Sequence, residues 1–101
     1  MECHAVCEHM IYQHCLPRGG AHATPEHLKL MADCAQICRV AADFMVRGSA
    51  HHALTCGICA NLCAACADDC ERIGDMDECV RACRTCAEEC REMVEAHAAA
   101  R

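Results

Sequence analysis

The chain has 101 residues and a mass of 11.0 kDa, which is the size of a single small domain. Fourteen residues are Cys, aromatic residues make up 2%, and Trp is absent, which excludes a core built on aromatic packing. Nine Lys and Arg residues in a chain of net charge -6 form no basic stripe, so we expect no nucleic-acid partner. We expect residues 1–101 to form one domain whose core depends on disulfides or metal.

Pro, Gly and capping residues divide the chain into four helical segments. Thr24 is a suitable N-cap for a helix with Pro25 in its first turn, and Gly48 and Gly74 stand where helix ends favour a left-handed residue. Strong helix formers fill the intervals, which predicts helices near residues 2–16, 25–47, 50–73 and 76–98. Short connections between such helices favour antiparallel neighbours. The predicted fold is all-α, an antiparallel up-down-up-down four-helix bundle.

Cysteines recur along the predicted helices at steps of three and four residues. The last two helices both contain the pattern C-x3-C-x2-C-x3-C, over 59–70 and 79–90. This spacing is that of the seam facing a bundle axis, where Leu or Ile normally stand. On the first helix, Cys15 falls one helical face away from Cys3 and Cys7. The predicted core is lined by Cys3, Cys7, Cys15, Cys34, Cys38, Cys56, Cys59, Cys63, Cys66, Cys70, Cys79, Cys83, Cys86 and Cys90.

Neither packing, disulfides nor isolated zinc sites account well for this series. A core of small thiols alone fills volume poorly, although a single buried Cys behaves as a small hydrophobe. Disulfides between residues three or four apart on one helix would close tiny loops and restrain little between helices. A four-cysteine zinc template fits Cys63, Cys66, Cys83 and Cys86, but the same helical series continues on both sides of it.

Cu(I) accounts for the whole series. Soft thiolate and thioether ligands select it, and it needs as few as two or three sulfurs per ion. Two cysteines four apart on a helix have Cβ atoms about 5–6 Å apart, so their sulfurs can converge on one ion. One monovalent ion per thiolate leaves the core neutral, whereas Zn(II) in separate four-thiolate sites leaves about -2 at each. The sequence therefore favours storage of multiple Cu(I) ions per chain.

These motifs carry a resemblance to a known family. The chain resembles the bacterial copper storage proteins, and the resemblance extends from Cys3 to His97. It rests on pairs of Cys four residues apart on all four helices and on the doubled motif of 59–70 and 79–90. The resemblance implies a bundle that holds Cu(I) for detoxification or for supply to copper enzymes. The N-terminus has no features of a secretory signal, and no segment predicts a membrane span. The chain is therefore similar to the cytosolic branch of the family, and we expect it in the cytoplasm. Members of that branch are homotetramers.

Methionines and histidines are expected at both ends of the bundle. One end is predicted to admit copper through the weaker thioether and imidazole ligands of Met45, His52, Met93 and His97. Cys56 is expected at the same end, with Cys3 at or near its rim. The other end is predicted to hold Cys15, His27, Met31, Cys70, Met76 and Cys79. Four other histidines are expected at the surface, namely His4, His9, His22 and His51. A second apolar stripe that includes Leu54 and Ile58 is expected to support self-association.

Two other functions use the same cysteines. A thiol redox switch would lock helices together by oxidation, with metal incidental. A zinc or cadmium buffer of metallothionein type would bind different ions in the same core. Catalysis needs one Cys set apart with an activating base, and the seam treats its thiols as equivalent, so we expect no enzyme.

Overall fold

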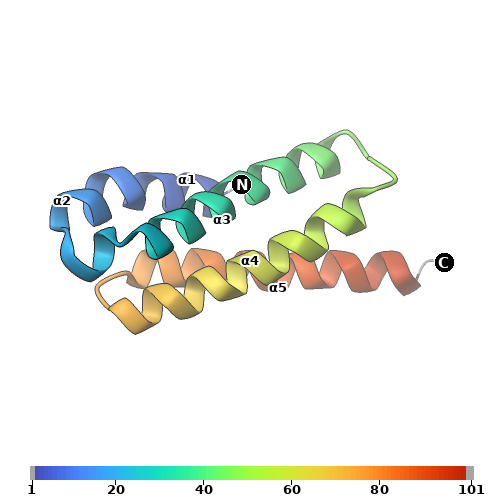
Figure 1. Cartoon of the computed structure of the whole chain (residues 1–101). Coiled ribbons are helices and arrows are strands. Elements are labelled where there is room, and N and C mark those ends of the chain that lie inside the picture. Colours follow the sequence, from blue (N-terminus) through green and yellow to red (C-terminus); the bar gives the residue numbers. More distant parts are fainter. Residues whose placement is uncertain (1, 100–101) are drawn as a thin grey trace.

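Three long helices run most of the length of the molecule in the computed structural model, which describes residues 2–99. They are α3 (Pro25–Val46), α4 (His52–Ile73) and α5 (Asp77–Ala99), and successive helices run in opposite directions (Figure 1). The molecule measures 47 × 21 × 19 Å. The predicted all-α antiparallel four-helix bundle is confirmed.

The fourth position of the bundle is filled by a shorter, irregular helical segment. It consists of α1 (Glu2–Met10), a π-helical turn (Ile11–Cys15) and α2 (Leu16–Arg18), and a 3-10 turn (Gly20–Ala23) connects it to α3. The segment packs against both α3 and α5. It takes the place of the regular helix predicted over 2–16.

The backbone confirms the predicted start of α3 and the glycines predicted after α3 and α4, whereas α4 begins at His52 and not at residue 50. The Thr24 hydroxyl accepts a hydrogen bond from the His27 N–H at 3.3 Å, with Pro25 in the first turn of α3. Gly48 and Gly74, which follow α3 and α4, have φ values of 66° and 88°. Glycine adopts this left-handed region without the steric penalty that a Cβ carries.

The π-helical turn explains how Cys15 reaches the predicted core although its spacing sets it one helical face away from Cys3 and Cys7. Hydrogen bonds in a π turn span five residues, so the turn is wider than a regular one. A regular helix through Cys3 and Cys7 leaves Cys15 one face away from the axis. The wider turn rotates it inward, and Cys15 is 0% exposed.

The prediction that Cys3 lies at or near the rim was also wrong. Figure 1 shows the N-terminal end of α1 beside the middle of α3. The Cys3 Sγ lies 3.8 Å from that of Cys34 and 3.9 Å from that of Cys63, which stand in the interiors of α3 and α4. The reason is length, because Glu2 to Arg18 spans about 25 Å at most and α3 about 33 Å.

Sulfur and small side chains fill the core. All fourteen Cys are buried together with Met10, Ile11, Met31, Met76 and five Ala. Helix α4 is long and apolar enough to cross a membrane by length and composition, with a mean hydropathy of 1.2, but 44% of that window is buried inside the bundle. The core helix of a soluble protein has the same profile, so this is weak evidence for a membrane span.

Candidate metal centre

The thiols form one continuous buried column. All fourteen cysteines are free, and none is more than 4% exposed. Their Sγ atoms approach one another between helices as well as along them, from 3.3 Å for Cys38 and Cys63 to 4.0 Å for Cys7 and Cys34. The predicted Cys-lined core is thereby confirmed.

Ten of the cysteines form four overlapping groups of four. Within each group the Sγ atoms all lie within 4.8 Å of one another. In the order in which they adjoin, the groups are Cys38/Cys59/Cys63/Cys86, Cys3/Cys34/Cys38/Cys63, Cys3/Cys7/Cys34/Cys83 and Cys7/Cys66/Cys79/Cys83. Each group shares two cysteines with the next. An ion in one group therefore has two ligands in common with an ion in the adjoining group.

The shared pairs are spaced for bridging. Their Sγ atoms lie 3.3 Å apart for Cys38 and Cys63, 3.8 Å for Cys3 and Cys34, and 3.5 Å for Cys7 and Cys83. With metal–sulfur bonds of about 2.3 Å, two ions that both contact such a pair lie about 2.6–3.2 Å apart. This spacing would allow one pair of sulfurs to bridge two ions.

Three further cysteines extend the column at its ends. The Cys70 Sγ lies 3.6 Å from that of Cys79 and 4.0 Å from that of Cys66. At the other end, the Cys90 thiol interacts with Cys59 and Cys86, and the Cys56 thiol interacts with Cys90. The Cys15 Sγ lies within 3.8 Å of His27 Nε2, Met31 Sδ and Met76 Sδ, and the Cys15 thiol also interacts with Cys66 and Cys79.

Neighbouring thiols and burial raise the pKa of most of these cysteines. Burial raises the pKa of Cys15 to about 11 and also raises the pKa of Cys56. Within the column, hydrogen bonding with Cys34 and other thiols lowers the pKa of Cys3, while the proximity of Cys3 and its neighbours raises that of Cys63. A set of buried bare thiolates would be very costly, so each bound cation replaces protons.

The four predicted Met and His residues meet in two pairs at one end of the bundle. Met45 and Met93 line one cavity of about 400 Å³ that also contacts Cys86 and Cys90. The rings of His52 and His97 pack edge to face, with centroids 5.2 Å apart. The two thioethers therefore lie beside Cys86 and Cys90.

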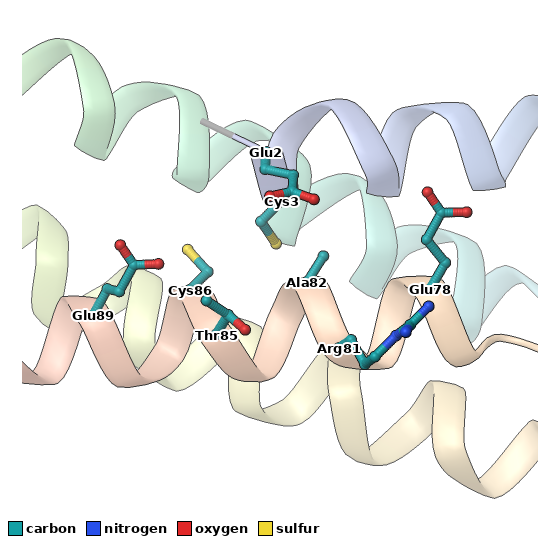
Figure 2. A pocket seen from close by; sticks show the side chains of 8 residues that line it. All are labelled: Glu2, Cys3, Glu78, Arg81, Ala82, Thr85, Cys86 and Glu89. Atoms are coloured by element: carbon teal, nitrogen blue, oxygen red, sulfur yellow. The ribbon is translucent and has the colours of Figure 1, made fainter.

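A second cavity, of about 670 Å³, opens between the start of α1 and α5. Figure 2 shows the sulfurs of Cys3 and Cys86 in the space between these two helices, with the carboxylates of Glu2, Glu78 and Glu89 around it. Cys86 and Glu89 also line the Met45 and Met93 cavity, so the two cavities adjoin. The heptad pattern of the sequence contains no signal for this side opening, which lies where α1 meets α5.

The opposite end gathers a different set of donors around Cys15. Its Sγ lies 3.5 Å from His27 Nε2, 3.8 Å from Met31 Sδ and 3.7 Å from Met76 Sδ. The expectation that His22 lies at the surface was wrong. It is 6% exposed, and its Nε2 lies 3.1 Å from the carbonyl oxygen of Gly74.

A column of buried thiols with shared pairs defines a class of helical bundle that can bind several soft metal ions within one chain. The family profile described as copper storage protein matches residues 1–95. The chain belongs to the copper storage protein family.

Individual relatives agree with this assignment. The uncharacterized cysteine-rich protein YhjQ of Bacillus subtilis (strain 168) is 34% identical over 70 residues, which cover 69% of this chain and 64% of that relative. The chain thus matches a little under two thirds of the length of that curated relative. Among solved structures, the Nmul_A1745 protein of Nitrosospira multiformis is 46% identical, with a TM-score of 0.91 over 93% of this chain and 86% of the other. The Cu(I)-bound copper storage protein BsCsp3 is 34% identical, with a TM-score of 0.82 over 91% and 88%.

Proposed function

We propose that this protein stores Cu(I), holding several ions per chain as cargo in its column of bridging thiols. The observation that carries the proposal is the sharing of two cysteines between each four-thiol group and the next. Shared thiolates let many ions occupy a narrow core with few ligands per ion, which suits capacity. Membership of the copper storage protein family and the Cu(I)-bound relative BsCsp3 support the same assignment.

The spacing within the column favours a monovalent ion. Bridged neighbours lie about 2.6–3.2 Å apart when metal–sulfur bonds are about 2.3 Å. Coulomb repulsion scales with the product of the charges, so two divalent ions at this spacing repel four times as strongly as two monovalent ions. One Cu(I) per thiolate also leaves the core neutral, which removes the cost of buried charge.

We infer that all fourteen cysteines are ligands and that one end of the bundle admits copper. Thioether and imidazole ligands there would receive the ion: Met45, Met93, His52 and His97. Cys86 and Cys90 line the same cavity as the two methionines, so transfer to thiolate needs no long passage. Each transfer to a thiol releases that thiol's proton and leaves the ion on a stronger ligand.

The remaining parts of the proposal concern the setting of the store. We infer a single domain over residues 1–101 that works in the cytoplasm as a homotetramer, without catalysis and without membrane or nucleic-acid partners. Leu54 and Ile58 on α4 are 69% and 52% exposed, which gives self-association an apolar surface. The family resemblance supports the number of subunits.

An anaerobic titration tests the proposal. Fully reduced protein receives Cu(I) against a chromophoric Cu(I) chelator, and the loaded protein is then exposed to excess zinc. We expect tight uptake of many ions per chain that zinc does not displace. Saturation at one or two ions, or displacement by zinc, would overturn it in favour of a zinc or cadmium buffer. Reversible oxidation of the thiols in a protein that takes up no copper would indicate a redox switch.

A further inference from the structure

Four soft donor atoms converge at the end of the bundle where the α1–α2 segment turns back to α3. The Cys15 Sγ is the centre of the group, with His27 Nε2 at 3.5 Å, Met76 Sδ at 3.7 Å and Met31 Sδ at 3.8 Å. None of the four residues is more than 1% exposed. The donors come from the π turn, α3 and the residue that precedes α5, so the fold itself brings them together.

These distances are those of ligands around a single ion. Ligands at about 2.3 Å for sulfur and about 2.0–2.1 Å for nitrogen in tetrahedral geometry lie about 3.8 Å apart for two sulfurs and about 3.5 Å apart for sulfur and nitrogen. The three measured separations from Cys15 match both values. The Cys15 sulfur is thus spaced from each of the other three donors as two ligands of one ion are.

The imidazole is held in the orientation that ligation requires. His27 Nδ1 donates a hydrogen bond to Asp69 Oδ2 at 2.7 Å, which leaves the Nε2 lone pair facing Cys15. A carboxylate oxygen accepts this hydrogen bond, which places the ring proton on Nδ1 of His27. The Arg72 guanidinium contacts the other carboxylate oxygen at 2.7 Å. A carboxylate behind a ligating His is a common feature of protein metal sites.

The π turn determines the direction of the Cys15 side chain. It rotates Cys15 off the face that a regular helix would give it and onto this cluster. None of the four-thiol groups contains Cys15. Cys15 thus stands outside the four-thiol groups, next to Cys66 and Cys79 at one end of the thiol column.

We propose that Cys15, His27, Met31 and Met76 form a distinct site for one Cu(I) ion, with Asp69 as the positioning residue. This inference rests on the proposed function, because it assumes a protein that is loaded with Cu(I). Binding releases the Cys15 proton, and the resulting thiolate balances the single positive charge of the ion. Two thioethers and an imidazole complete a soft donor set that selects Cu(I) over Zn(II).

Silver NMR identifies the ligands directly. Ag(I) replaces Cu(I) as a diamagnetic soft ion, and the protein carries carbon-13 in its methionine methyl groups. We expect silver-109 scalar coupling at Met31 and Met76 and none at Met10, with Met31→Leu and Met76→Leu assigning the two signals. Uptake of many ions without coupling at either methionine would overturn the site and leave the storage function intact. A wild-type chain that takes up neither Ag(I) nor Cu(I) would overturn the storage function itself.

A second experiment measures affinity. The double variant Met31→Leu, Met76→Leu keeps apolar volume, so the bundle is expected to fold and to load its thiol column. We expect it to retain one Cu(I) fewer per chain than wild type against a chromophoric chelator, while the control Met10→Leu retains the wild-type number. Asp69→Asn should weaken one ion about 10- to 100-fold and spare the others. Wild-type retention by both the double variant and Asp69→Asn would overturn the inference.

Discussion

Cys34 and Cys66 separate the effect of bridging from the effect of thiol number. Cys34 belongs to two of the four-thiol groups and Cys66 to one, and both are 0% exposed. Replacement by Ala removes one buried sulfur in either case, at a matched cost of about 1 kcal/mol in the metal-free protein. Loss of Cys34 takes a ligand from two adjoining sites, whereas loss of Cys66 takes a ligand from one. We therefore expect about two weakened ions in Cys34→Ala and about one in Cys66→Ala.

The assay is competitive removal of copper. Each variant is saturated anaerobically with Cu(I) and then challenged with a fixed excess of chromophoric chelator, and the ions removed beyond the wild-type number are counted. Urea unfolding of the metal-free variants checks that their stabilities match. Equal numbers of extra ions removed from the two variants would refute bridging, because only the number of thiols would then matter.

Three further predictions concern the ends of the bundle and its pH dependence. The residues proposed to admit copper are Met45, His52, Met93 and His97. Their simultaneous replacement should slow Cu(I) loading in stopped-flow measurements and leave the final capacity nearly unchanged. An unaltered loading rate would contradict their role. Burial raises the pKa of Cys15 from 9.0 to about 11, so the unfolded chain loses this proton first as the pH rises. Between pH 9 and 11 the metal-free reduced protein should therefore lose on the order of 2 kcal/mol more stability than the Cys15→Ala variant, seen as a steeper fall of the urea midpoint, and parallel falls would exclude this linkage. Thr24→Ala removes the N-cap of α3 and should cost about 1 kcal/mol in urea unfolding, whereas Thr24→Ser should restore most of it.

Much of the fold could be predicted because its determinants are local. Thr24, Gly48 and Gly74 mark helix ends through capping and left-handed backbone, which depend on single residues. The alternating steps of three and four between cysteines fix the face that each helix turns toward the axis. Burial of the cysteines other than Cys15 follows from that spacing.

The parts that could not be predicted depend on geometry between helices. The interval of eight residues between Cys7 and Cys15 exceeds two regular turns, and it is the only sequence signal for the π turn. In the sequence, Asp69 has the position of an ordinary solvent-facing carboxylate on its helix. Its hydrogen bond to His27, 42 positions away along the chain, depends on how α3 and α4 pack. The sharing of cysteines between adjoining groups likewise depends on the heights at which four helices meet.

X-ray absorption at the copper edge of the fully loaded protein tests the bridged thiolate store most directly. The account predicts a first shell dominated by sulfur together with a copper–copper shell at about 2.6–3.2 Å, as the shared pairs and metal–sulfur bonds of about 2.3 Å require. A loaded protein whose copper shows sulfur neighbours but no copper neighbour at that distance would contradict it, because its ions would then occupy isolated sites.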